Sequence, residues 1–441
     1  MTPSARLQAV LELLTEITSI PRPADALVSA YFRARRYIGS KDRAYVSTTL
    51  YDVLRHHARL EWWLRKEGGE LTPRAQLLAY LALVEQKSLA VMTELFSGGK
   101  FAAKAISDDE GAVLHKLEHH TITHPSMPDD VAGECPAWAL AGLKSRFGKN
   151  LLRELQALLK SAPLDLRVNP LKAEREPMLA EIKKAGLKAE PCRLSPFGIR
   201  VDERPSLNAL PMLKNGQIEI QDEGSQMVAF LVDAKPGQRV VDFCAGAGGK
   251  TLAIAAAMKN KGRIIACDVL ANRLKRSTER FRRAGLHNIE VKPLTSENDP
   301  WVKRHKASFD RVLVDAPCSG TGTWRRNPDS RWKTLGPGLE NLLPLQASIL
   351  ASASRLVKPG GRLVYATCSL LTDENEAQIE DFLVAHKDFH LIKVSEVLKQ
   401  TIPDLTPPSP DPYLALTPAQ HNTDGFFAAV MERDKASKEE E

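Results

Sequence analysis

From residue 239 onward, short apolar runs alternate with longer segments that have helical spacing. The apolar runs cover residues 239–243, 263–267, 289–292, 311–314 and 362–367. Strands that alternate with helices in this way pair in parallel, because each helix carries the chain back to the starting edge of the sheet. This half of the chain is therefore predicted to form an α/β fold, a mostly parallel sheet with helices on both faces.

The first part of the chain follows a different pattern. Up to about residue 130, apolar residues recur at helical spacing and turn signals interrupt them, which predicts an all-helical domain. A helical connector follows, and from Pro163 short β-like runs surround a helix near 177–185, which indicates a small α/β module. We expect domains at 1–130, 131–234 and 235–433, followed by a charged, disordered tail at 434–441.

Composition and charge narrow the class of protein. The chain has 441 residues, 43% hydrophobic and 26% charged, as expected of a globular protein and not of a disordered or collagenous one. No apolar run reaches the ~18 residues of a membrane span, and acids interrupt the apolar N-terminal spacing, so we expect a cytoplasmic protein. The net charge of +7 suits a polyanionic partner.

The six cysteines have no metal-ligand spacing. None forms a CxxC pair, so neither a zinc site nor a disulfide framework is expected, and we predict no metal. The thiols are then available for chemistry.

A glycine-rich turn follows the first predicted strand of the sheet. The segment 240–251 runs from an apolar strand through Gly246, Gly248 and Gly249 into a helix. Glycines allow a ligand to approach the backbone closely, and a helix N-terminus offers N–H donors. We expect a cofactor at this turn.

Three cofactor classes compete for such a turn. A phosphate-binding P-loop needs glycine where this chain has Cys244, and a dinucleotide fingerprint needs glycine where it has Thr251. Asp268 ends the next predicted strand, where a carboxylate can accept both ribose hydroxyls of an adenosine. S-adenosylmethionine fits both features.

Two cysteines follow predicted strands at the same edge of the sheet. One apolar strand leads to Asp315 and Cys318, and another leads to Cys368. A single cysteine is more often a small core residue, but ligands of open α/β sheets bind at the carboxyl ends of the strands. A thiol beside a methyl donor suits methylation at C5 of a pyrimidine, because thiolate addition at C6 makes C5 nucleophilic. Asp315 would stabilise the proton on N3; which thiol attacks stays open at this point.

Four segments are similar to those of the RsmB/Sun family of RNA cytosine-5 methyltransferases. They are DFCAGAGGKT, DRVLVDAPCSGTGTWRRNPD, YATCSLLTDENE and HNTDGFFAAV, in family order within about residues 160–432. The resemblance implies a Rossmann-like, seven-stranded methyltransferase domain preceded by a small RNA-binding module. It also implies that Cys368 attacks and that Cys318 is the general acid/base or assists release. Residues 41–64 are similar to the NusB-like helical domain of bacterial ribosomal-RNA members.

The resemblance also implies cofactor contacts. They carry over to Cys244, Ala245, Gly246, Ala247, Gly248, Gly249, Lys250, Asp268 and Asp315. The chain departs from the family pattern at Gly246-Ala247, where the family has Ala-Pro, and at Asn422, where it has glycine. Thr295 stands near the position of a family acid and is expected to replace it weakly.

RNA is the expected partner, and the protein is expected to act as a monomer. Arg325, Arg326 and Arg331 follow the Cys318 segment and are predicted to grip the substrate strand, while the basic run 272–283 suits either phosphate or solvent. The target base must be flipped out or unpaired. Ribosomal RNA is favoured over transfer RNA. The sequence also leaves open a non-catalytic RNA-binding assembly factor and a nucleotide-hydrolysing enzyme, both of which it favours less.

Overall fold

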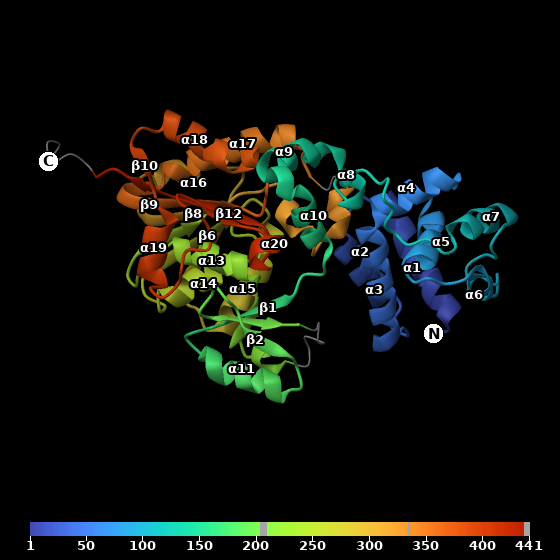
Figure 1. Cartoon of the computed structure of the whole chain (residues 1–441). Coiled ribbons are helices and arrows are strands. Elements are labelled where there is room, and N and C mark those ends of the chain that lie inside the picture. The colour runs from blue at the N-terminus through green and yellow to red at the C-terminus, as the bar shows by residue number, and fades with distance from the viewer. Residues whose placement is uncertain (203–209, 334–335, 436–441) are drawn as a thin grey trace. The chain divides into compact units, whose positions relative to one another are not determined.

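The computed structural model describes residues 1–202, 210–333 and 336–435 (Figure 1). Most of the predicted charged tail lies outside these residues. The chain divides into two compact units, one of residues 1–160 with 324–337 and one of residues 161–323 with 338–441. No helix in the described part of the chain is both long and apolar enough to cross a membrane.

The first unit is helical, as the apolar spacing predicts. Polar N-caps begin several of its helices, and Ser107 and Glu110 form a reciprocal capping box at the start of one of them. Its core is continuous and includes the fully buried Trp63. The helices are α1 (Pro3–Ser19), α2 (Ala24–Ala34), α3 (Ser40–Arg55), α4 (His57–Glu67), α5 (Pro73–Leu83), α6 (Leu89–Leu95), α7 (Asp108–Leu117), α8 (Asp129–Ala132), α9 (Ala137–Phe147) and α10 (Leu151–Leu159).

Two segments join this helical unit against expectation. The predicted connector forms α8 to α10 and, by its contacts, groups with the helices before it up to residue 160; the expected domain boundary at residue 130 stays a prediction. Residues 324–337 also belong to it, although the chain before and after them belongs to the other unit. We call residues 324–337 the strap.

The second unit begins with the small α/β module. Its sheet is antiparallel in the order β2-β3-β1-β4, and the core under it includes Leu166, Ile182 and Ile218. The elements are β1 (Leu164–Val168), α11 (Arg175–Lys184), β2 (Ala189–Pro191), β3 (Gly198–Val201), α12 (Pro211–Lys214) and β4 (Ile218–Ile220).

The large sheet of this unit runs in the order β10-β12-β9-β8-β5-β6-β7, and β11 pairs with β12. The strands β9, β8, β5, β6 and β7 are parallel to one another, and β12 is antiparallel to β9, β10 and β11. The strands are β5 (Arg239–Asp242), β6 (Arg263–Asp268), β7 (Ile289–Pro293), β8 (Phe309–Asp315), β9 (Val357–Thr367), β10 (Phe389–Ile392), β11 (Leu414–Leu416) and β12 (Phe426–Arg433).

Alternate residues of the strands enter two different cores. Val240 and Ile264 belong to one cluster, while their neighbours Val241 and Ile265 belong to the other. Strand side chains alternate between faces, so the sheet is covered on both sides and the predicted α/β class is confirmed. The helices are α13 (Glu223–Leu231), α14 (Gly249–Ala257), α15 (Ala271–Ala284), α16 (Pro300–Arg304), α17 (Leu339–Ser354), α18 (Glu376–Ala385), α19 (Val394–Thr401) and α20 (Pro418–His421).

Candidate active site

The glycine turn joins β5 to α14 at the carboxyl edge of the sheet. Gly246 and Gly248 have φ angles of +55° and +77°, a left-handed conformation that glycine adopts without strain. A Cβ on Gly248 would also lie 2.6 Å from Cε1 of Phe281, whereas a Cβ on Gly246 would meet no atom within 4 Å. The absence of a side chain at Gly248 therefore lets Phe281 pack against the turn, whereas Gly246 borders open space.

Asp268 ends β6 directly beside this open space. Its Oδ2 accepts a hydrogen bond from the Gly246 N–H at 2.8 Å, and its Oδ1 accepts one from the Leu270 N–H at 2.7 Å. The next two side chains, Val269 and Leu270, are 56% and 50% exposed. A carboxylate beside an open glycine turn and an apolar surface fits the ribose and adenine of an adenosine cofactor.

Lys250 and Asp315 form an ion pair at this edge. Lys250 Nζ lies 2.7 Å from Asp315 Oδ2. Burial alone would lower the pKa of Lys250, but the Asp315 carboxylate outweighs it and raises that pKa above its ordinary value. A charged lysine therefore holds the Asp315 carboxylate in place.

Asp242, at the end of β5, is fully buried beneath the turn. Its Oδ2 accepts a hydrogen bond from Thr251 Oγ1 at 2.6 Å, and burial raises its pKa to about 7. Desolvation also raises the pKa of Cys244 well above its ordinary value. Cys244 is thus a neutral thiol that packs beside the turn.

The two predicted site cysteines meet. Sγ of Cys318, in the loop after β8, lies 3.5 Å from Sγ of Cys368, which follows β9. Both side chains are partly exposed. The hydrogen bond with Cys368 and burial together raise the pKa of Cys318 well above its ordinary value, so Cys318 keeps its proton near neutral pH.

Glu374 accepts hydrogen bonds from both of the loops that carry Cys318 and Cys368. It is fully buried, and its carboxylate accepts hydrogen bonds from the Ser319 N–H at 2.8 Å, from Gln346 Nε2 at 2.9 Å and from the hydroxyls of Ser319 and Ser369. Ser319 follows Cys318 and Ser369 follows Cys368, so one carboxylate fixes both loops. Glu374 lies in the YATCSLLTDENE segment, and no role for it is predicted from the sequence.

A close backbone contact supports the same two loops. The Gly322 N–H donates to the carbonyl of Cys368 at 2.9 Å, and the Gly425 N–H donates to the carbonyl of Gly322 at 2.9 Å. A Cβ on Gly425 would lie 2.7 Å from Cα of Gly322. Asn422, where the family has glycine, ends α20 with a φ of +57°, a conformation that asparagine tolerates better than most residues.

Gly425→Ala is expected to lower the stability of the second unit by about 2 kcal/mol and the rate of the catalysed reaction more than tenfold, because the new methyl group must push β12 away from the Gly322 backbone. Urea unfolding and an activity assay would measure both. Gly111→Ala in α7 is the control: its Cβ meets no atom within 4 Å. Full activity of Gly425→Ala would refute this account of the contact.

Thr295 lies after β7 and binds an acid that sequence reasoning missed. The N–H and the hydroxyl of Thr295 both donate to Asp299 Oδ2, each at 2.9 Å. These bonds, together with the Trp301 N–H, lower the pKa of Asp299 to about 2. The acid side chain at this end of β7 is therefore Asp299, four residues beyond Thr295.

Two of the three arginines predicted to grip RNA are buried in the helical unit. Arg325 and Arg331 are each 2% exposed. The Arg331 guanidinium donates to the carbonyls of Glu134 at 2.9 Å and Leu158 at 2.7 Å, and it lies over the Trp324 ring. These contacts show that Arg331 serves the packing of the strap. RNA binding by Arg325, Arg331 and the partly exposed Arg326 stays a prediction, and the burial of the first two counts against it.

The basic helix α15 is partly committed to a structural role. Arg280 and Arg283 both bind the carboxylate of Glu219 on β4, at 3.0 and 2.6 Å. These ion pairs hold the small module against α15. Three other basic side chains of α15 are exposed: Arg273, Lys275 and Arg276. They could contact phosphates or only solvent, and both interpretations remain.

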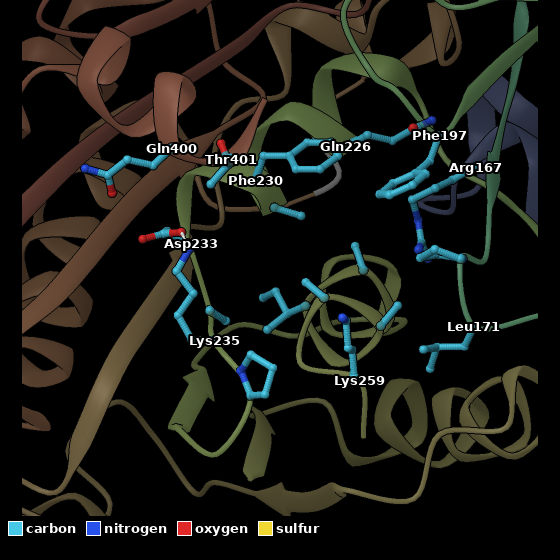
Figure 2. A pocket seen from close by; sticks show the side chains of 18 residues that line it. Arg167, Leu171, Phe197, Gln226, Phe230, Asp233, Lys235, Lys259, Gln400 and Thr401 are labelled. Atoms are coloured by element: carbon cyan, nitrogen blue, oxygen red, sulfur yellow. Dashed lines mark ion pairs between the residues drawn. The ribbon is translucent and has the colours of Figure 1, made fainter. Parts of the chain in front are cut away.

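A hollow of about 440 Å³ lies elsewhere in the second unit (Figure 2). Phe197 and Phe230 stack in its wall with ring centroids 5.9 Å apart, and Arg167 lies beside Phe197. Lys235 and Pro236 line it just before β5 begins, at the opposite end of that strand from the glycine turn. None of the predicted cofactor or catalytic residues lines this hollow.

The sheet order, the glycine turn after β5 and the acid at the end of β6 define the chain as a Rossmann-like methyltransferase. A family model described as 16S rRNA methyltransferase RsmB/F matches residues 229–432, and a second, for the ferredoxin-like domain of RsmF/B-like methyltransferases, matches residues 135–208. The chain belongs to this RsmB/F family, which confirms the resemblance, and its cofactor is S-adenosylmethionine.

Relatives resemble the chain over nearly its whole length. It is 32% identical to a probable ribosomal RNA small subunit methyltransferase B from Synechocystis, covering 89% of this chain and 91% of that protein. It is 34% identical to the ribosomal RNA small subunit methyltransferase B of Photorhabdus laumondii, over 90% and 92%. The crystal structure of PH0851 matches 98% of this chain and 99% of that one, with a TM-score of 0.80 and 26% identity.

Proposed function

We propose that this methyltransferase acts on C5 of a cytosine in RNA through a covalent adduct. The observation that carries the proposal is the pair of thiols 3.5 Å apart, on loops that follow neighbouring parallel strands. One thiol suffices for a covalent bond to the base, and a second beside it suits the proton transfer that releases the product.

Cys368 is the nucleophile that adds to C6, and Cys318 assists the release. The hydrogen bond between the two sulfurs supports these roles, because a protonated Cys318 stabilises a thiolate on Cys368. Asp315, held by Lys250, would face N3 of the base and favour the proton there as electron density moves into the ring. When bound, S-adenosylmethionine supplies a methyl group on a sulfonium centre.

Asp268 and the open turn at Gly246 would hold the adenosine part of the cofactor. The carboxylate is already fixed by two backbone N–H groups, so it is oriented before any ligand arrives. The exposed Val269 and Leu270 offer an apolar surface to a base ring. Preorganised groups of this kind lose little entropy when the ligand binds.

Small-subunit ribosomal RNA is the proposed substrate. Relatives that match about nine-tenths of the chain are named ribosomal RNA small subunit methyltransferase B. The matching family is described as a family of 16S rRNA methyltransferases. The N-terminal helical unit is present in addition to the catalytic domain, which suits a large RNA substrate.

The test is methyl transfer from labelled S-adenosylmethionine to naked small-subunit RNA, to the assembled small subunit and to transfer RNA, followed by nucleoside analysis. We expect label in 5-methylcytosine from ribosomal RNA, with transfer RNA unlabelled. Label in a different nucleoside would refute the cytosine-C5 proposal, and label confined to transfer RNA would refute the substrate.

A further inference from the structure

A second hollow, of about 490 Å³, lies on the helical unit. Side chains of α1, α2 and the segments that follow α2 and α6 line it. Two of them are aromatic and strongly exposed: Tyr37 is 77% and Phe101 70% exposed. These are the two most exposed of the large apolar side chains in the described part of the chain. A single exposed ring is ordinary on a protein surface, but here two of them line the same hollow.

Cations lie over two aromatic rings that line the hollow, Tyr31 and Phe101. The Arg35 guanidinium lies 3.8 Å from the centre of the Tyr31 ring, and Lys100 Nζ lies 5.5 Å from that of Phe101. Arg36, between Arg35 and Tyr37 in the sequence, is exposed. Two cationic side chains, Arg35 and Lys100, therefore line the hollow, and the exposed Arg36 adjoins two lining residues in the sequence.

The acids near the hollow are already neutralised. Glu12 accepts a hydrogen bond from the Tyr31 hydroxyl at 2.8 Å and pairs with Arg35 at 3.3 Å. Asp42 is bound by Arg6 and by the N-terminal amine, at 2.6 and 2.8 Å. The surface thus presents aromatic rings and net positive charge.

We propose that this hollow binds an unpaired stretch of the substrate RNA, with bases stacked on Tyr37 and Phe101 and phosphates near Arg36 and Lys100. The inference rests on the proposed function, since it takes RNA as the substrate. Proteins hold single-stranded nucleic acid by combining exposed aromatic rings, on which bases stack, with cations that contact the phosphates. A protein partner is less favoured, because protein interfaces are depleted of lysine and glutamate and this hollow is lined by Lys100 and Glu12.

The experiment compares the full-length chain with the double variant Tyr37→Ala/Phe101→Ala. Binding of fluorescently labelled small-subunit RNA is expected to weaken about tenfold for each lost ring, because each ring loses a stacked base. The KM for RNA should rise by a similar factor, while kcat at saturating RNA and the affinity for S-adenosylmethionine stay unchanged. Tyr37→Phe keeps a stacking face and should bind as the parent does. Val384→Ala removes an exposed apolar side chain from α18 and is the matched control.

Unchanged RNA affinity in the double variant would overturn the proposal and leave this surface to a protein partner. A fall in kcat at unchanged KM would also overturn it, since that would indicate a general loss of structure. The binding measurement does not depend on methylation. If no RNA is methylated and yet RNA binding still depends on Tyr37 and Phe101, the surface is supported while the proposed function fails.

Discussion

Cys368→Ala is expected to abolish methylation, with a loss of about 10⁴-fold or more, because removal of a covalent nucleophile leaves only binding and positioning to act on the base. The fold should survive, since the side chain is partly exposed and its loop is held by backbone bonds to Gly322. Transfer of labelled methyl groups to small-subunit RNA would measure the loss. Retained affinity for S-adenosylmethionine would show that the cofactor site is intact.

The Cys318→Ala variant should fail at a different step of the reaction. In Cys318→Ala the nucleophile remains and the release step is impaired, so a covalent protein–RNA adduct should accumulate and resist denaturation on a gel. Cys135→Ala, which removes a buried thiol from the helical unit, is the control and should turn over normally. An adduct in Cys368→Ala and none in Cys318→Ala would reverse the two roles.

The meeting of these two cysteines could be predicted from the sequence. Each follows an apolar strand, and the carboxyl ends of neighbouring parallel strands lie at one edge of a sheet, so two loops far apart in the chain arrive together. The glycine turn and Asp268 follow from the same rule. What the rule does not give is the distance of 3.5 Å, which depends on Glu374 and on the Gly322–Gly425 contact.

Those supporting residues could not be read from the pattern. In the sequence, Glu374 stands in a run of acids that is typical of a solvated turn. Gly322 and Gly425 are far apart in the chain, and nothing in the sequence around them indicates that their backbones touch. Asp299 was missed for a similar reason. It lies four residues beyond Thr295 and contacts it as the N-cap residue of α16.

The predicted helical region and alternating sheet were both confirmed, yet the strap was not foreseen. Its sequence, between a strand end and α17, continues the catalytic domain, and its arginines look like substrate contacts. Burial is a tertiary property: Arg331 lies inside the helical unit because backbone carbonyls of Glu134 and Leu158 face it there. The sequence around Arg331 does not indicate that those two carbonyl acceptors lie beside it.

Arg331→Ala is expected to lower the free energy of unfolding of the helical unit by about 3 kcal/mol, because it leaves buried carbonyls without a donor and opens a gap beside Trp324. Burial lowers the pKa of Arg331 to about 10, so the side chain is still charged near neutral pH and its hydrogen bonds are charge-assisted. Urea unfolding followed by tryptophan fluorescence would report the change, since Trp324 and Trp138 lie next to this residue.

Arg65→Ala provides the control, because the Arg65 side chain is 64% exposed and its surface pair with Glu61 should contribute less than about 1 kcal/mol. Arg331→Lys should be intermediate, since one ammonium cannot reach both carbonyl groups with the geometry of the guanidinium fork. If Arg331→Ala instead left stability unchanged and weakened RNA binding, Arg331 would be a substrate contact after all. Stability and RNA affinity measured on the same variants therefore separate a residue that holds the strap from one that holds the RNA.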